Sequence, residues 1–313
     1  MGLLIGGVWH SDVPKPTGKD GSFQREASSF RHHIGTPDTP AETHRYHLFV
    51  SLACPWAHRT LIMRSLKGLQ DIIPTTIVHP HLLEQGWSFA EPEPLYGFKH
   101  LHQLYTLAQA DYTGRVSVPV LWDTQKKRII NNESADIMRI FNHAFDALTG
   151  NTQDFYPEPL RPAIDDINAF IYQHINNGVY KCGFAQSQTA YQQAYEALFS
   201  ALDTVEARLD QHRYLVGNTC TEADIRLFTT LIRFDAVYVG HFKCNRNRII
   251  DMPNLWAYLC DLYQQEGFSE YVNLEHIKQH YYYSHADINP TRIVPQGPKL
   301  DFNQAHHRHE QFA

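Results

Sequence analysis

The sequence lacks any Cys-x-x-Cys pair. Its five cysteines are scattered along 313 residues, at Cys54, Cys182, Cys220, Cys244 and Cys260. An odd number of widely spaced cysteines argues against a disulfide framework and against the paired ligands of a zinc ribbon. This pattern is typical of a protein kept in a reducing compartment, so we expect a cytoplasmic location.

Long apolar runs and an excess of basic residues are missing as well. No run of about 18 apolar residues occurs, so we expect no transmembrane helix and no membrane partner. The start of the chain has no basic region before a short apolar part, so we expect no signal peptide. Lys and Arg number 27 against 33 Asp and Glu, a formal charge of −6, which argues against nucleic acid as a partner.

The first part of the chain contains a strand, a helix and a second strand. Residues 1–43 are rich in Gly, Pro, Ser and Thr with little periodicity, which predicts an extended N-terminal arm. Residues 45–53 form a short bounded apolar run, which predicts a strand, and residues 54–69 show a helical apolar stripe. Pro55 suits the first helical position, where no amide hydrogen bond is needed. Residues 72–80 predict a second strand, parallel to the first because a helix connects them.

The following segments complete the order of a thioredoxin-like domain. We expect a helix around 98–108, two antiparallel strands at 118–123 and 128–131, and a helix from Glu133. Beyond a Pro-rich boundary at 156–162, helical periodicity alone remains. The predicted fold is therefore an α+β thioredoxin-like domain followed by an all-α domain. The predicted boundaries are an arm at 1–43, a thioredoxin-like domain at 44–150, and an all-α domain with a C-terminal extension at 151–313.

Cys54 stands where the first predicted strand gives way to the helix. A thiol at a helix N-terminus faces unpaired amides and the positive end of the helix dipole. That setting stabilises a thiolate and can lower the thiol pKa from about 8.5 to roughly 3.5–7.5. His58 and Arg59 on the first turn could add positive charge. A buried structural cysteine is the alternative, but the strand–Cys-Pro–helix context favours a nucleophile.

Ala57 occupies the position where a dithiol motif carries its second cysteine. A dithiol resolves its mixed disulfide internally, which alanine cannot do. The resolving thiol must then come from outside the protein, and glutathione is the abundant cytosolic candidate. We therefore predict a glutathione site beside Cys54.

Two further segments fit a glutathione site. In thioredoxin-type folds the place of Val118-Pro119 holds a cis-proline, and the backbone of the preceding residue pairs with a peptide ligand. An ordinary strand start is the alternative for this pair. Glu133 and Ser134 begin a predicted helix, whose amides and serine hydroxyl can bind a carboxylate while Glu133 binds an ammonium group. A γ-glutamyl group carries both charges, although a simple helix cap would also explain these two residues.

Cys, Val-Pro and Glu-Ser in this order resemble the glutathione transferase superfamily. Thr221 and Asp224 match the Thr-x-x-Asp capping box of its helical domain, which is a folding element. Nearly the whole chain is similar to the Xi class, the glutathionyl-hydroquinone reductases, through SLACPWAHRT, GSFQREASSFR, GRVSVPVLWD, NNESADI, GVYKCGFA and IKQHYYYSHADINPTRIVPQGP. Arg292 departs from the class, which is expected to have glycine there, and this departure concerns the tail rather than the chemistry.

The resemblance implies a role for each site residue. Cys54 would be the nucleophile, Trp87 would stack over bound glutathione, and Val118 would pair with glutathione through its backbone. Glu133 and Ser134 would hold the γ-glutamyl end.

The resemblance further implies an aromatic substrate pocket lined by Tyr180, Tyr238 and Tyr281. A tyrosine ring can pack on a substrate ring while its hydroxyl bonds a hydroquinone oxygen. Within the run Tyr281–Tyr283, the sequence leaves open which residue faces the pocket.

The implied activity is glutathione-dependent reduction of S-glutathionyl-hydroquinones in quinone detoxification. It would proceed through a Cys54-glutathione mixed disulfide and release oxidised glutathione, in a homodimer that takes aromatic glutathionyl conjugates. An omega-like thiol transferase or dehydroascorbate reductase, and a non-catalytic glutathione-binding scaffold, are the alternatives. We expect no metal cofactor, and we expect the His-rich tail 305–311 to be solvated rather than metal-binding.

Overall fold

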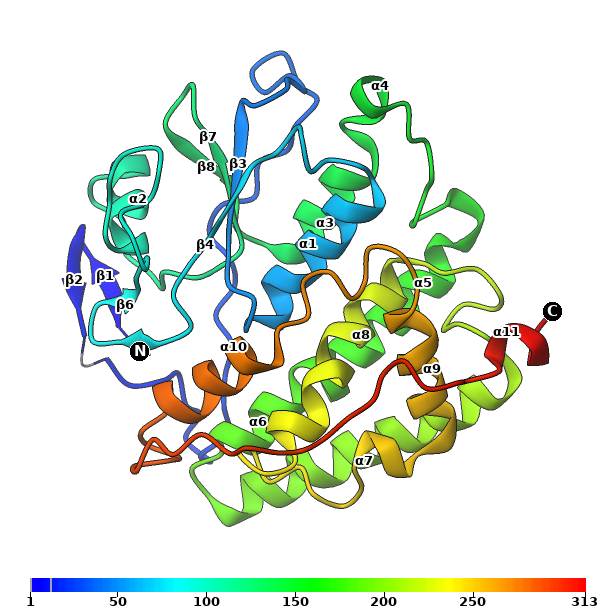
Figure 1. Ribbon diagram of the computed structural model, residues 1–313. Coiled ribbons are helices and arrows are strands. Elements are labelled where there is room, and N and C mark those ends of the chain that lie inside the picture. The colour runs from blue at the N-terminus through cyan, green and yellow to red at the C-terminus, as the bar shows by residue number, and fades with distance from the viewer. Residues whose placement is uncertain (1, 12) are drawn as a thin grey trace. The chain divides into compact units, whose positions relative to one another are not determined.

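A central sheet organises the first half of the chain in the computed structural model, which describes residues 2–11 and 13–313 (Figure 1). The strand order is β4-β3-β7-β8, with β3 at Tyr46–Val50, β4 at Thr75–Ile77, β7 at Val120–Asp123 and β8 at Arg128–Asn131. β3 pairs with β4 in parallel and with β7 antiparallel, and β7 pairs with β8 antiparallel. All five residues of β3 are buried, as its continuous apolar run predicts.

Helices flank this sheet on both sides (Figure 1). Helix α1 (Pro55–Leu66) packs against α3 (Ser134–His143), and α2 (Leu101–Ala108) packs near β8 on the other side. The short α4 (Asp146–Thr149) follows α3. The order β3-α1-β4-α2-β7-β8-α3 confirms the predicted thioredoxin-like arrangement.

Short strands appear where none is predicted. The N-terminal arm begins with an antiparallel hairpin of β1 (Leu3–Ile5) and β2 (Val8–His10), which is anchored by reciprocal backbone hydrogen bonds between Leu4 and Gly114 of 2.9 and 3.0 Å. A second small hairpin joins β5 (Leu82–Leu83) to β6 (Gly86–Trp87). The extended arm predicted over 1–43 therefore begins with a hairpin that the sequence pattern did not indicate.

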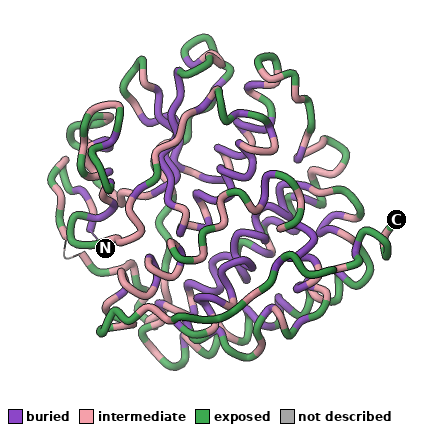
Figure 2. Tube along the Cα trace, viewed as in Figure 1, coloured by how far each residue is buried: buried purple, intermediate pink, exposed green. Residues whose placement is uncertain are grey.

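The second half is helical, as predicted. Its elements are η1 (Glu158–Leu160), α5 (Arg161–Ile171), η2 (Tyr172–Asn176), α6 (Gly178–Phe184), α7 (Gln188–Gln211), α8 (Glu222–Arg233), η3 (Phe234–Tyr238), η4 (Ile249–Asp251), α9 (Pro253–Tyr263), α10 (Leu274–Lys278), η5 (Gln279–Tyr283) and α11 (Arg308–Gln311). Every residue of α8 is buried, so this helix is the core of the helical part (Figure 2). The predicted capping box is present at its start, where Thr221 and Asp224 bond each other. No helix in the described part of the chain is long and apolar enough to cross a membrane.

The chain forms two compact units that are not continuous in sequence. The sheet unit comprises residues 1–15, 26–153 and 275–286, and the helical unit comprises 16–25, 154–274 and 287–313. The predicted domains 44–150 and 151–313 are continuous stretches, whereas the arm and the C-terminal extension contribute to both units. The predicted boundaries at 1–43, 44–150 and 151–313 stay a prediction.

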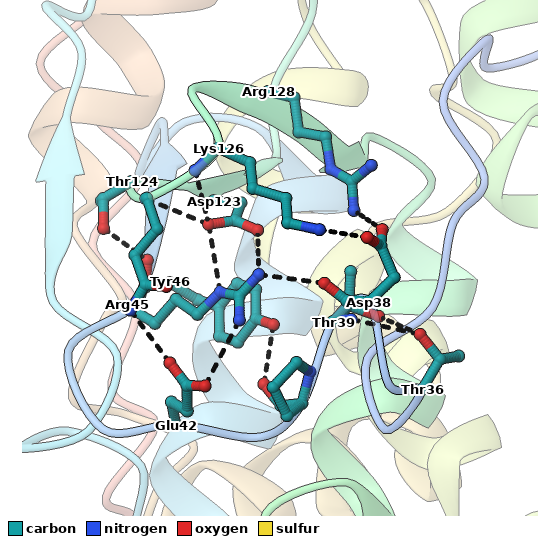
Figure 3. Close-up of polar contacts among 12 residues, drawn as sticks. Thr36, Asp38, Thr39, Glu42, Arg45, Tyr46, Asp123, Thr124, Lys126 and Arg128 are labelled. Atoms are coloured by element: carbon teal, nitrogen blue, oxygen red, sulfur yellow. Dashed lines mark hydrogen bonds and ion pairs between the residues drawn. The ribbon is translucent and has the colours of Figure 1, made fainter.

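The edge of the sheet where β3 begins and β7 ends is held by ion pairs (Figure 3). Arg45 Nη2 lies 2.7 Å from Asp123 Oδ2, and both side chains are almost fully buried. Burial opposes ionisation of Asp123, but the hydrogen bonds from Arg45 and from backbone amides outweigh it and lower its pKa. Lys126 and Arg128 both pair with the exposed Asp38 of the arm (Figure 3).

The His-rich tail is not simply solvated. Arg308 is 1% exposed, and its guanidinium donates to the carbonyls of Leu209, His212 and Arg213 at the C-terminal end of α7. Burial lowers the pKa of Arg308. The neighbouring His307 stays largely exposed, so the prediction of a solvated tail is wrong for the buried arginine.

Candidate functional site

Cys54 is the N-cap of α1, and three residues separate it from Val50, the buried last residue of β3. Its backbone is extended (φ −76°, ψ 120°), and Pro55 starts the helix as predicted. The carbonyl of Cys54 accepts the first helical hydrogen bond from the amide of His58, at 3.0 Å. The half-buried thiol is therefore attached at the end of α1 where helix amides lack intrahelical partners and the helix dipole is positive.

Val118 lies next to this cysteine. The Val118-Pro119 peptide bond is cis, as predicted, and Cys54 Sγ lies 3.6 Å from the carbonyl oxygen of Val118. Residues 64 positions apart are thus brought together at the start of the segment that leads into β7. The structure therefore joins two of the sequence-predicted site residues in direct contact.

Glu133 and Ser134 lie where β8 ends and α3 begins. Glu133 is the N-cap of α3, and its Oε1 accepts a hydrogen bond from the amide of Ala135 at 3.2 Å. The Ser134 hydroxyl donates to the same oxygen at 3.5 Å, and Ser134 is 2% exposed. The helix-cap interpretation of Glu133 is thus correct as geometry, and a capping carboxylate can still accept bonds from a ligand ammonium group.

The N-terminal arm contributes a residue that sequence reasoning missed. The Ser28 hydroxyl donates to Glu133 Oε2 at 3.0 Å. Nearby, Arg31 pairs with Asp136 in the first turn of α3, and the amide of His32 donates to the carbonyl of Ile130 at 2.9 Å. The arm segment thus runs beside β8 and reaches the predicted γ-glutamyl site. The motif GSFQREASSFR marked this arm segment, but nothing in the motif singled out Ser28.

Arg31 also sets the electrostatics at the start of α3. Burial opposes ionisation of Asp136, yet the hydrogen bonds from Arg31 and Asn131 outweigh it and lower the pKa of Asp136. This carboxylate is therefore charged and partnered within the protein. Glu133 remains as the acidic group at the helix cap itself.

Trp87 ends the β5–β6 hairpin and is 6% exposed. Its indole stacks on the imidazole of His280, with ring centroids 4.9 Å apart and an interplanar angle of 18°. Sequence reasoning did not single out His280, which lies beside the tyrosine run of the C-terminal extension. Trp87 belongs to the same compact unit as Cys54, Val118 and Glu133.

Tyr180 and Tyr238 are neighbours in the helical unit. Their ring centroids lie 6.2 Å apart, and Phe242 stacks on Tyr238 at 5.5 Å. The guanidinium of Arg25 lies 4.9 Å from the centroid of Tyr180, while its Nε donates to Asn177 Oδ1 at 2.6 Å. The structure thus brings two of the three predicted pocket tyrosines together, and it adds a cation from the arm.

Tyr281 belongs to the sheet unit, not to the helical unit that holds the other two tyrosines. It is 1% exposed and contacts His280 and His285 edge-on. Tyr283 stacks on His81 at 3.9 Å. The rings of Tyr281 and Tyr283 therefore pack against different partners. The assignment of Tyr281 to the pocket stays a prediction.

His58 and Arg59, which follow Cys54 on the first turn of α1, are both buried. His58 is 0% and Arg59 is 2% exposed, and the Arg59 guanidinium lies 4.5 Å from the Trp56 ring centroid. No group of three or more His, Cys, Asp or Glu side chains in the described part of the chain is arranged to hold a metal ion. The chemistry this arrangement supports is nucleophilic attack by the Cys54 sulfur.

Comparison with known proteins shows close similarity over the full length. Residues 53–144 match the family model "Glutathione S-transferase, N-terminal domain", and residues 188–259 match "Glutathione S-transferase, C-terminal domain". The chain is 51% identical to glutathionyl-hydroquinone reductase YqjG of Escherichia coli (strain K12), covering 100% of both chains. It is 48% identical to glutathionyl-hydroquinone reductase PcpF of Sphingobium chlorophenolicum, covering 95% of this chain and 96% of that one.

Solved structures agree with the sequence matches. The glutathione-bound structure of Escherichia coli K-12 YqjG superposes with a TM-score of 0.90 at 49% identity, over 99% of this chain and 100% of that one. A Xi-class glutathione transferase from Natrialba magadii gives a TM-score of 0.93 at 46% identity, over 99% and 97% of the two chains. The predicted two-domain fold is thereby confirmed.

Proposed function

We propose, from the premise that this chain belongs to the Xi class of the glutathione S-transferase family, that it is a glutathionyl-hydroquinone reductase. It would reduce S-glutathionyl-hydroquinones to hydroquinones with glutathione as co-substrate. The observation that carries this proposal is the position of Cys54 at the N-terminus of α1, with its sulfur 3.6 Å from the carbonyl oxygen of Val118. The chain that holds this cysteine is 51% and 48% identical to two proteins named as glutathionyl-hydroquinone reductases.

The reaction begins with the Cys54 thiolate, which attacks the glutathionyl sulfur of the conjugate. A sulfur–sulfur bond forms, the bond from sulfur to the aromatic carbon breaks, and its electron pair leaves with that carbon. A proton added to the carbon completes the hydroquinone. Glutathione thiolate then attacks the Cys54–glutathione disulfide and releases oxidised glutathione, so the kinetics should be ping-pong.

Glutathione is held in this proposal by Trp87, Val118, Glu133 and Ser134. The carbonyl of Val118 is a backbone acceptor beside the Cys54 sulfur, and Glu133 offers a carboxylate at a helix N-terminus. Support for Ser134 comes from its hydroxyl, which lies at the same helix start.

The aromatic ring of the substrate is assigned to Tyr180, Tyr238 and Tyr281. A tyrosine hydroxyl can donate the proton to the departing carbon or stabilise a keto tautomer of the product. The support is the contact between Tyr180 and Tyr238 and the Arg25 guanidinium beside Tyr180. A nearby cation favours a developing oxyanion.

Turnover of glutathionyl-menadione tests the proposal. Wild-type protein should reduce this conjugate, Cys54→Ala should lose activity, and Cys260→Ala should keep it because Cys260 is buried in α9 of the helical unit. Faster turnover of dehydroascorbate than of the conjugate would instead indicate an omega-like thiol transferase. Binding to immobilised glutathione without turnover of either compound would indicate a scaffold.

Location and assembly complete the proposal. All five cysteines lie in the described part of the chain and none forms a disulfide, which supports a cytoplasmic location. A homodimer is proposed from the family resemblance. Sedimentation of purified protein at micromolar concentration measures it, and a single monomeric species would contradict it.

A further inference from the structure

The C-terminal extension docks on the hairpin that carries Trp87. The amide of Leu82 donates to the Ser284 hydroxyl at 2.9 Å, and His81 Nε2 lies 2.9 Å from Gln279 Oε1. The imidazole of His81 stacks on Tyr283 with an interplanar angle of 10°. Residues 275–286 and this hairpin belong to the same compact unit. A segment from the far end of the sequence therefore helps to build the Trp87 region.

His280 is the member of this segment that touches Trp87 face to face. The rings are nearly parallel at 4.9 Å, and both residues are buried, His280 at 7% and Trp87 at 6% exposed. His280 Nδ1 lies 2.9 Å from the carbonyl oxygen of Pro80. Because a carbonyl only accepts, Nδ1 carries the hydrogen, and this bond fixes the rotation of the imidazole.

A fixed imidazole constrains the indole packed against it. Stacked aromatic pairs prefer a narrow range of geometries and contribute beyond the apolar area that they bury. One face of the Trp87 indole is covered by His280, so a ligand can meet only the opposite face or the ring edge. The carbonyl of Pro80, the imidazole and the indole thus form a series in which each group orients the next.

From this series we propose that His280 is a positioning residue for glutathione binding and acts through Trp87. The inference rests on the proposed function, because it takes Trp87 to contact glutathione. His280 itself need not touch the ligand. Its effect should therefore appear in glutathione affinity and vanish when Trp87 is absent.

The experiment is a double-mutant cycle on ligand affinity. Binding of S-methylglutathione, which cannot form a disulfide with Cys54, is measured by titration calorimetry. We expect His280→Ala to weaken binding about 3- to 10-fold, the range for loss of one aromatic stack. His280→Phe keeps a ring in place and should stay within about twofold of wild type. In a Trp87→Ala background, His280→Ala should have no further effect.

Two other variants separate positioning from general damage. Tyr283→Ala removes a stack from the same segment without touching Trp87, and it should leave affinity unchanged. If His280→Ala does not fold, His280→Asn is used, since it keeps a donor for Pro80 and loses the ring. It should bind as weakly as predicted for alanine.

Several outcomes would overturn the inference. They are additive effects of His280→Ala and Trp87→Ala, an equal loss in Tyr283→Ala, or no loss in either His280→Ala or His280→Asn. Failure of the proposed function looks different. Wild-type protein would then leave glutathionyl-menadione unreduced while the binding cycle still showed coupling between His280 and Trp87.

Discussion

Asp123 ends β7 with its carboxylate buried against Arg45, and Asp123→Asn removes the charge while keeping the shape. The buried guanidinium of Arg45 would lose its buried partner and keep the partly exposed Glu42, whose Oε1 lies 3.4 Å from Arg45 Nη1. Removing one partner of a buried ion pair costs about 3–5 kcal/mol. We therefore expect urea unfolding to show a loss of about 3 kcal/mol in the free energy of unfolding.

Asp38→Asn is the matched control, because its partners Lys126 and Arg128 are paired at an exposed site. Its loss of stability should be much smaller, as for exposed ion pairs in general. Equal losses in the two variants would contradict the role given to burial.

His47 makes stability depend on pH. Burial, together with the charge of Arg64, lowers the pKa of His47 to about 4 from 6.5. Between these values the unfolded chain binds the proton and the folded chain does not, so stability falls as pH drops from about 6.5 to about 4. The full effect is roughly 3 kcal/mol.

His47→Gln tests that pH dependence, because glutamine cannot titrate and can still reach the Thr76 hydroxyl, which lies 2.8 Å from His47 Nε2. Unfolding free energies measured across this range should fall less steeply for the variant. Parallel curves for wild type and variant would assign the acid sensitivity to other groups.

At the scale of elements, α8 depends on the capping box at its start. The amide of Thr221 donates to Asp224 Oδ2 at 2.8 Å, and the Thr221 hydroxyl donates to the same oxygen at 3.1 Å. Thr221→Ala should cost about 1–2 kcal/mol in chemical unfolding, because an N-cap at a fully buried helix is lost. Thr221→Ser should recover most of the loss, and a serine variant no better than alanine would count against a capping role.

Elements with strong local signals could be predicted from sequence. β3 is a short bounded apolar run, and α1 has Pro at its start, so local preference and tertiary packing agree. The hairpin β1–β2 could not be predicted, since its strands are three residues each and depend on pairing with Gly114, far along the chain.

The site shows the same division between local and distant information. Cys54, Val118 and Glu133 sit at element ends that sequence marks. Ser28 comes from the arm and contacts the helix cap at Glu133, and His280 comes from the C-terminal extension and contacts the hairpin at Trp87. Only folding brings these distant segments to the site. The backbone of Arg292 has a φ of 55°, in the left-handed region that favours glycine. This conformation agrees with the glycine that the resemblance leads us to expect at this position.

At the scale of the whole molecule, the tail stabilises the helical unit through Arg308. Its guanidinium satisfies carbonyls at the end of α7, which is a favourable place for a cation. Arg308→Met keeps the buried volume but leaves those carbonyls unsatisfied, so we expect a loss of about 2 kcal/mol in unfolding free energy. His307→Ala, at the exposed neighbour, should change little, and an unaffected Arg308→Met would show that the tail is dispensable.

The covalent intermediate on Cys54 is the centre of the proposed function, and intact-protein mass spectrometry with peptide mapping measures it directly. Protein mixed with oxidised glutathione or glutathionyl-menadione should gain one glutathione on Cys54, and added glutathione should remove it. Cys54→Ala should show neither the adduct nor turnover. An adduct confined to another cysteine, no adduct at all, or full activity in Cys54→Ala would contradict the proposed mechanism.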